Sequence, residues 1–196
     1  MTLIHVIDTE TSTTSFDEHG IPNGHIVEVG IARVDTGRRE ITPYYVGIIN
    51  DPGCDGTEWV FENTDLSLED VREGEPRESV DRYLSALLAG QQVTAYNVPF
   101  DRTMMDRDLP LTASTVRWGY CLMLASAQVE GIPRKHAGMG CYPRAEDSYN
   151  HLCPDDPRGL RGKERHRALD DAMMEAHILL ALIDRGIYPL IGGSPL

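Results

Sequence analysis

Three segments near the start of the chain, residues 3 to 8, 26 to 34 and 41 to 49, are rich in Ile, Val and Tyr, and turn-forming residues separate them. This pattern predicts three β-strands that pair as an antiparallel meander. Pro43 lacks a backbone N–H, which demotes the third strand to a sheet edge or a bulge. A fourth, shorter strand is predicted at "QVTAY", residues 92 to 96.

Helical patterns follow the meander. The segment "ESVDRYLSALLAG" has apolar residues at helical spacing and ends at Gly90, and a second helix is predicted near Phe100, after Pro99 breaks the fourth strand. "GYCLMLASAQ" predicts a further helix, and "HRALDDAMMEAHILLALIDRG" predicts a long one that ends at Gly186. Strands first and helices later, with one strand between helices, indicate an α/β fold with a mixed sheet flanked by helices.

The length of 196 residues suits a single domain spanning residues 1 to 196. Within it, residues 131 to 165 hold many Gly and Pro residues and no clear period, apart from one helical turn that "EDSYNHL" could form. We interpret residues 131 to 165 as a long irregular loop segment, because loops of this length inside a compact domain are usually functional or mobile.

Composition favours a globular protein outside the membrane. Hydrophobic residues make up 41% and charged residues 25% of the chain, and the longest apolar run, "HILLALI", is too short to span a bilayer. The first apolar stretch begins at residue 3, which leaves no room for a signal peptide. We therefore expect a cytoplasmic location and no membrane partner.

The four cysteines are best interpreted as reduced thiols, since a cytoplasmic chain of this size rarely depends on a disulfide framework. A zinc site is the alternative, with Cys141, His151, Cys153 and His136 as its ligands. Their spacing includes no close Cys-x-x-Cys pair, which favours plain core or loop residues.

The charge balance limits how the chain can meet nucleic acid. It has 18 Lys and Arg residues against 31 Asp and Glu residues, a net charge of -13, which argues against a protein that coats duplex DNA. Any such contact should be local. One basic run, "RGLRGKERHR" at residues 158 to 167, could make it, or could be a solvated loop.

Asp8 and Glu10 stand two positions apart where the first strand ends. Residues two apart point to the same face of a strand, so the two carboxylates would lie side by side if the extended backbone continues through Thr9. Two oxygen ligands at this spacing suit Mg²⁺ or Mn²⁺. The competing interpretation is a strand end that runs into a polar loop.

Asp101, in "AYNVPFD", follows a short strand in the position where open sheets place ligands. Asn97, four residues earlier, could orient a neighbouring group. An isolated Asp at a helix start is also a common partner of the helix dipole, so Asp101 alone does not decide between the two roles.

The segment "HRALDD" offers two further acids and a histidine. With the buried stripe taken as Ala172, Ala176, Leu179 and Ile183, Asp171 lies about 100° from the centre of the stripe and Asp170 about 160° away. Asp171 is therefore predicted at the border of the buried face, and Asp170 in water. His166 would stack on Asp170 only if the helix already included it.

Taken in order, these segments resemble the DnaQ-like DEDDh 3′-5′ exonucleases of the RNase H-like superfamily, which includes proofreading subunits, RNase T and oligoribonuclease. "IDTET" resembles the first motif of the family, with Asp8 and Glu10 as its acids. "AYNVPFD" resembles the second motif, and "HRALDDA" the third, which assigns His166 and Asp171. Three motifs in family order make a chance match very unlikely.

The resemblance implies a mixed five-stranded RNase H-like sheet, an antiparallel meander followed by parallel strands and flanked by helices. It implies a metal-dependent 3′-5′ exonuclease that releases nucleoside 5′-monophosphates from single-stranded DNA or RNA with a free 3′ end. Two Mg²⁺ or Mn²⁺ ions would be held by four acids, Asp8, Glu10, Asp101 and Asp171, and His166 would be the general base.

Further expectations concern substrate contacts and partners. Thr11 and Ser12 could meet the terminal nucleotide through backbone amides or hydroxyls, with Asn97 and Phe100 beside them. A homodimer is compatible with the resemblance. The alternatives are a catalytically idle module that binds nucleic acid or a protein partner, and a proofreading subunit attached to a polymerase.

Overall fold

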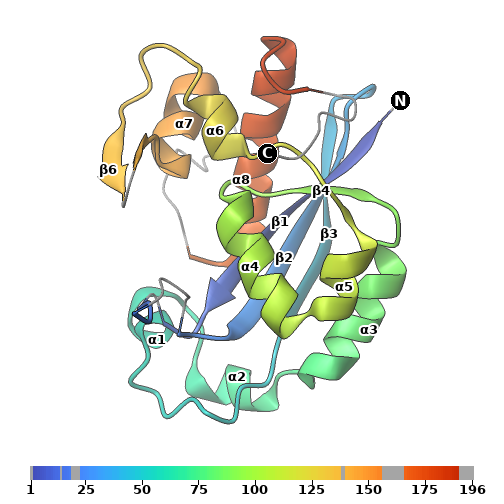
Figure 1. Cartoon of the computed structure of the whole chain (residues 1–196), viewed down its shortest axis with the longest axis vertical. Helices are drawn as coiled ribbons and strands as arrows, with labels where there is room; N and C mark the ends of the chain where they lie inside the picture. The colour runs from blue at the N-terminus through green and yellow to red at the C-terminus, as the bar shows by residue number, and fades with distance from the viewer. Residues whose placement is uncertain (1, 14, 19–22, 138–139, 156–165, 190–196) are drawn as a thin grey trace.

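The structure of the 196-residue chain is a computed structural model that describes residues 2–13, 15–18, 23–137, 140–155 and 166–189 (Figure 1). Its centre is a five-stranded sheet in the spatial order β3-β2-β1-β4-β5. The first three strands form an antiparallel meander, and the last two run parallel to β1. The predicted mixed sheet is confirmed, with these bounds: β1 (Leu3–Thr11), β2 (Ile26–Asp35), β3 (Glu40–Ile48), β4 (Gln92–Thr94) and β5 (Arg117–Trp118).

β3 is an edge strand, and its pairing with β2 is irregular beside Pro43. Ile31 pairs with Tyr45, but the next residue of β2, Ala32, pairs with Pro43. One residue of β3 is therefore left over as a bulge. Both placements that the proline allowed, an edge and a bulge, occur together.

Helices cover both faces of the sheet (Figure 1). α8 (Ala168–Asp184) packs on β1, β2 and β3 from one side, and α4 (Val98–Asp108) packs on β1 and β2 from the other. Among the described helices, none is both long and apolar enough to cross a membrane. The remaining helices are α1 (Trp59–Asn63), α2 (Leu68–Glu73), α3 (Arg77–Leu87), α5 (Pro110–Thr115), α6 (Leu122–Ser126) and α7 (Ala145–Leu152).

Alternation along β1 divides the core into two layers. Ile4 and Val6 lie in the cluster that includes α8, whereas Ile7 lies in the cluster that includes α3 and α4. Residues with the same parity share a face of a strand. Asp8 and Glu10 therefore continue the face that α8 covers.

Several elements differ from their predicted bounds. α4 begins at Val98 rather than near Phe100, and α6 has only five residues. β4 ends at Thr94, because the next backbone groups bond elsewhere: the N–H groups of Leu122 and Met123 donate to the carbonyls of Ala95 and Tyr96.

The segment predicted as irregular contains three regular elements among its described residues. β6 (Lys135–Ala137) and β7 (Gly140–Tyr142) pair as an antiparallel hairpin, and α7 confirms the helical turn expected around "EDSYNHL". Strands of three residues are too short to show alternation, so this hairpin has no sequence signal of its own. Residues 156–165 lie outside the described part of the chain.

Candidate active site

The carboxylates of Asp8 and Glu10 come from the last part of β1, which stays extended through Thr11. The two side chains therefore share a face, as predicted, and Thr9 points to the other side. The hydroxyl of Thr9 donates a hydrogen bond of 2.9 Å to Oδ1 of Asp101. Glu10 is 7% exposed, and Asp8 is half-buried and open to the cavity described below.

Asp101 reaches the same place from the first turn of α4. Asn97 precedes the helix, and its carbonyl accepts the N–H groups of Phe100 and Asp101, so the chain turns sharply from β4 into α4. Asp101 is 4% exposed. A carboxylate buried this deeply needs a hydrogen-bond or charge partner, and Thr9 supplies one.

α8 brings the third group of side chains. Asp171 and Glu175 lie one helical turn apart and are 6% and 4% exposed. His166 precedes the helix with a φ of 51°, in the left-handed region, so it lies on the incoming loop and does not stack on Asp170. Asp171 is buried, and Asp170 is half-buried rather than in water, so the helical phase predicted their order of burial but not the full exposure of Asp170.

These side chains meet in one open cavity of about 190 Å³. Ligand atoms of Glu10, His166 and Asp171 all lie within 4.8 Å of one another, and this is the group of possible metal ligands found among the described residues. The cavity brings together the five predicted catalytic residues with Asn97 and Phe100; its full lining is Asp8, Thr9, Glu10, Tyr96, Asn97, Phe100, Asp101, Ala145, His166, Asp171, Met174 and Glu175.

The pKa values of two carboxyl groups in the cavity, Asp8 and Asp101, are raised. Burial, and then repulsion from Glu175, Glu10 and the other acids of the cavity, raises the pKa of Asp8 well above its usual range. Burial also raises the pKa of Asp101 to about 7, despite the hydrogen bond from Thr9. A divalent cation would relieve this repulsion, and a set of carboxylates with one imidazole fits Mg²⁺ or Mn²⁺.

Thr11 and Ser12 were predicted to contact substrate, but neither lines the described cavity. The hydroxyl of Thr11 donates to the carbonyl of Thr13 at 3.1 Å, and the hydroxyl of Ser12 accepts the N–H of His25 at 3.0 Å. Both hydroxyls therefore contact the protein's own backbone. Contact of these two residues with a nucleotide stays a prediction.

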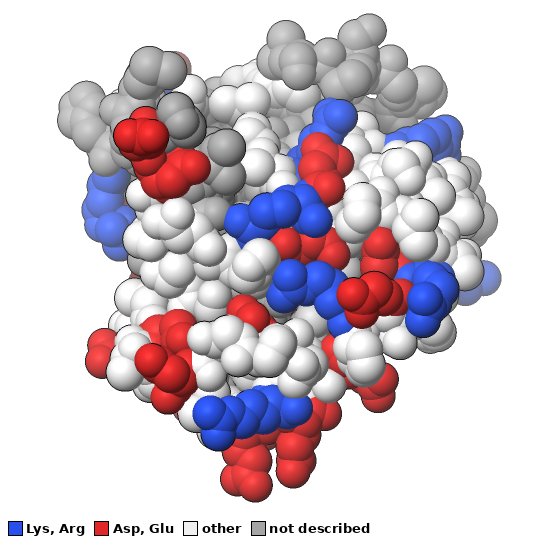
Figure 2. Space-filling view, turned by 60° about the horizontal axis from the view of Figure 1, so that its bottom comes forward, with Lys and Arg blue, Asp and Glu red and all other residues white. Residues whose placement is uncertain are grey.

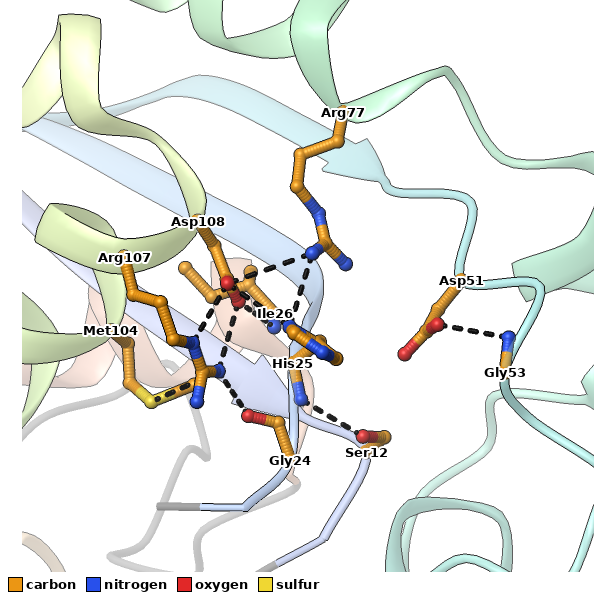
Figure 3. A network of polar contacts seen from close by, with 10 residues as sticks. All are labelled: Ser12, Gly24, His25, Ile26, Asp51, Gly53, Arg77, Met104, Arg107 and Asp108. Atoms are coloured by element: carbon orange, nitrogen blue, oxygen red, sulfur yellow. Dashed lines mark hydrogen bonds and ion pairs between the residues drawn. The ribbon is translucent and has the colours of Figure 1, made fainter. Parts of the chain in front are cut away.

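A polar network behind Ser12 fixes the start of β2 (Figure 3). The carboxylate of Asp108, at the end of α4, accepts the N–H of Ile26 at 2.8 Å. The same carboxylate pairs with Arg107 at 2.9 Å, with Arg77 at 3.5 Å and with the imidazole of His25 at 3.0 Å. The arginines that surround Asp108 are therefore engaged in holding α4 and α3 to the meander.

The predicted basic run at residues 158 to 167 lies outside the described residues up to residue 165. Its last member, Arg167, pairs with the buried carboxylate of Glu28. On the face shown in Figure 2, acidic and basic side chains are interleaved.

The cysteines are free thiols: Cys54 and Cys121 are buried, Cys153 is half-buried and Cys141 is exposed. In the described part of the chain the metal-ligand cluster contains none of them. The side chain of His136, the fourth member of the alternative zinc set, lies outside the described residues.

Comparison with known proteins found matches among solved structures only. No protein-family model and no curated protein matches the sequence. A 3′-exonuclease solved for 3′-end-specific recognition of a histone mRNA stem-loop matches with a TM-score of 0.64 at 14% identity, over 95% of this chain and 83% of that one. Exonuclease I of E. coli in complex with a dT13 oligonucleotide matches at 0.61 and 18%, over 94% of this chain and 41% of that one.

A third match is cell-death related nuclease 4, with a TM-score of 0.61 at 13% identity, over 94% of this chain and 64% of that one. The chain has the RNase H-like fold of these exonucleases. At such low identity the likeness establishes the fold, and the chain spans less than half the length of Exonuclease I.

Glu175 belongs to the site but was not predicted from the sequence. It lines the cavity, and its Oε2 accepts the N–H of Tyr96 at 3.1 Å. After burial, repulsion from Glu175 is the largest cause of the raised pKa of Asp8. A signal existed, because Glu175 stands four residues after Asp171 and therefore on the same side of the helix.

Trp59, in α1, was missed as well. Its ring lies edge-on to that of His166, with centroids 5.3 Å apart and planes at 82°. α1 is attached to the end of β1 by a hydrogen bond from the N–H of Val60 to the carbonyl of Ser12. No local pattern marks Trp59, since the contact joins segments more than a hundred residues apart in the chain.

Proposed function

We propose that the chain is a metal-dependent 3′-5′ exonuclease, which removes nucleoside 5′-monophosphates from the 3′ end of single-stranded DNA or RNA. One observation carries this proposal: three separate parts of the chain bring Asp8, Glu10, Asp101, His166 and Asp171 into one cavity. They do so on a fold shared with a solved 3′-exonuclease and with Exonuclease I.

The acids are proposed as ligands of two divalent ions. Asp8, Glu10 and Asp171 would hold one ion, and Asp8 with Asp101 would hold the second. Bound there, Mg²⁺ or Mn²⁺ supplies charge stabilisation for the phosphodiester and its leaving oxygen. The raised pKa of Asp8 supports this role, because part of the rise comes from repulsion by neighbouring carboxylates, which a shared cation would relieve.

His166 is proposed as the group that takes the proton from the attacking water. Imidazole is suited to proton transfer near neutral pH. Its ring lies within 4.8 Å of the ligand atoms of Glu10 and Asp171, and Trp59 contacts it from the side. Asn97 and Phe100 line the same cavity and are proposed to contact the terminal nucleotide.

The test is an exonuclease assay on matched DNA and RNA oligonucleotides that carry a 5′ label. With Mg²⁺ or Mn²⁺, the wild-type protein should produce a ladder that shortens from the 3′ end and disappears with chelator. Asp8→Asn should lower the rate by about 10³-fold or more, since it removes a proposed ligand of both ions. His166→Ala should lower it by about 10²-fold to 10⁴-fold.

Asp170→Asn is the matched control, because Asp170 adjoins Asp171 but does not line the described cavity. It should keep nearly full activity. If the wild-type protein shortens neither DNA nor RNA under these conditions, the nuclease proposal is wrong, and an idle nucleic-acid or partner-binding module takes its place. If Asp8→Asn kept the wild-type rate, the proposed role of Asp8 as a ligand of both metal ions would be wrong.

A further inference from the structure

We propose that Glu28 is a positioning residue of the site: through Arg167 and the first turn of α8, it sets where His166 and Asp171 stand relative to Glu10. This inference rests on the proposed nuclease function. Glu28 does not itself line the described cavity, so it is not a catalytic residue or a proposed metal ligand.

The first support is the place of Glu28 in the sheet. It lies on β2 directly opposite Glu10 on β1. Cross-strand partners share a face, so both side chains point toward α8. Glu28 is nevertheless 1% exposed, which is unusual for a carboxylate and requires close partners.

Those partners are the two residues that join the incoming loop to α8. Nε of Arg167 lies 3.1 Å from each oxygen of Glu28, and its second nitrogen lies 2.6 Å from Oε1. The backbone N–H of Ala168 donates to Oε2 at 2.9 Å. One carboxylate thus fixes the guanidinium and an N–H of the first helical turn.

Arg167 is the N-cap residue of α8, and its own side chain makes no cap hydrogen bond. Glu28 therefore does from a neighbouring strand what a cap residue usually does locally. Its negative charge also faces the positive end of the helix dipole.

The same turn rests directly on the strand beside Glu28. A Cβ on Gly30 would lie 2.1 Å from backbone atoms of Ala168 and Leu169, so only a glycine permits this approach. Gly30 thus determines how close the turn comes to β2, and Glu28 determines where along the strand it sits. His166, one residue before Arg167, and Asp171, whose N–H donates to the carbonyl of Arg167, move with that turn.

A buried ion pair is weak support for a gain in stability, because removing its charges from water offsets most of their attraction. The bidentate geometry of the pair, however, strongly restricts how Arg167 is oriented relative to Glu28. A displacement of about 1 Å at a catalytic group can lower a rate by about 10²-fold. The pair is therefore expected to matter more for the turnover rate than for folding.

The test compares Glu28→Gln and Arg167→Lys with a control, Asp81→Asn. Asp81 is also a buried acid that caps a helix, since it accepts the N–H groups of Leu111 and Thr112 at the start of α5, away from the cavity. We expect kcat on a labelled oligonucleotide to fall by about tenfold or more in Glu28→Gln, with KM changed by less than about threefold. Asp81→Asn should leave kcat unchanged at a comparable loss of Tm.

A second readout does not need turnover. Mn²⁺ binding can be titrated by calorimetry or by the electron paramagnetic resonance signal of unbound Mn²⁺. The affinity for Mn²⁺ should be lower in Glu28→Gln than in the wild-type protein, and unchanged in Asp81→Asn. Arg167→Lys keeps the positive charge but loses the bidentate geometry of the guanidinium group, so its kcat should lie between those of Glu28→Gln and the wild-type protein. The double variant Glu28→Gln with Arg167→Lys should be little worse than Glu28→Gln alone, because the two residues act as one unit.

A kcat and a Mn²⁺ affinity in Glu28→Gln within twofold of the wild-type values would overturn the inference while leaving the nuclease proposal intact. So would an equal loss of kcat in Asp81→Asn. If Glu28→Gln does not fold, Arg167→Lys decides by the same criteria. A wild-type protein that neither binds Mn²⁺ nor shortens an oligonucleotide would instead refute the proposed function itself.

Discussion

At the scale of single residues, the site gathers the carboxylates of Asp8, Glu10, Asp101, Asp171 and Glu175 in one cavity. Glu175 adds a fifth carboxylate beside Asp8 and contributes the largest charge repulsion on it. Its Oε2 also accepts the N–H of Tyr96, a bond that an amide oxygen could accept equally well. The charge of Glu175 and its hydrogen bond can therefore be separated by a single substitution.

Glu175→Gln should stabilise the protein in chelator and weaken its response to metal. Removing one charge from a buried acidic group relieves repulsion, which we expect to raise the free energy of unfolding by about 1 kcal/mol and Tm by about 2 to 4 °C. Thermal melts with chelator and with Mn²⁺ measure both effects. The gain in Tm on adding Mn²⁺ should be smaller than in the wild-type protein.

Asp170→Asn is the control for this experiment too, since it removes a charge from the same helix outside the cavity. It should leave the gain in Tm on adding Mn²⁺ as large as in the wild-type protein. A lower Tm for Glu175→Gln in chelator would show that hydrogen bonding, not charge, decides the role of Glu175.

The residues of the site differ in how far the sequence could predict them. Asp8 and Glu10 followed from the period of a strand, and Asp171 from the phase of a helix, because both depend on neighbours in the chain. Glu175 was within reach of the same argument. Trp59 and Glu28 were not, since each acts through a contact with the loop before α8 that only the folded chain creates.

At the scale of elements, α8 both fills the core and carries side chains of the site. Its residues Ala172, Ala176 and Leu179 are fully buried in the core layer over the sheet. Its first turns carry Asp171 and Glu175. The contact that joins these tasks is the one between Gly30 and the backbone of Ala168.

Gly30→Ala should therefore damage stability and activity together. The added methyl group cannot avoid backbone atoms on both sides, so α8 must move away from β2, and we expect a loss of about 3 kcal/mol or more in the free energy of unfolding. Gly186→Ala is the control, because Gly186 has open space around it and only a positive φ of 68°. Its cost should be about 1 kcal/mol, with kcat unchanged.

Urea unfolding followed by circular dichroism gives both free energies, and the oligonucleotide assay gives kcat. If Gly30→Ala and Gly186→Ala lose equal stability, the close approach of helix and strand is not what the glycine provides.

Element predictions succeeded where segments are long and periodic. The meander, α3 and α8 were predicted with bounds close to those observed, and α8 stops before Gly186 as expected. β5, with two residues, shows no period, so the resemblance implied a fifth strand but no pattern located it. α1, α2 and α5, with six residues or fewer, were not predicted. Their conformations are decided by packing against the larger elements.

At the scale of the whole molecule, the acidic cavity should dominate how stability depends on pH. An acid whose pKa is raised by folding keeps its proton in the native state while the unfolded chain loses it, so the free energy of unfolding falls as pH rises through that window. Burial raises the pKa of Asp101 to about 7, so the window runs from about pH 4 to about pH 7.

In chelator, Tm should therefore fall as pH rises from about 5 to about 7.5, and Asp101→Asn should flatten this slope. Burial of His5 lowers the pKa of its imidazole and acts in the opposite direction below about pH 6.5, equally in both proteins. The difference between the two melting profiles is thus the quantity to measure. Identical profiles would show that Asp101 titrates as it does in the unfolded chain.

The cavity takes its acids from the first strand, from a helix in the middle of the sequence and from α8, the last helix of the described chain. Contacts between such distant segments form late, because long loops must close first. On the ribosome, Asp8 and Glu10 exist long before Asp171 has been synthesised. A nascent chain therefore holds only part of the proposed nuclease site until α8 has emerged and packed against the sheet.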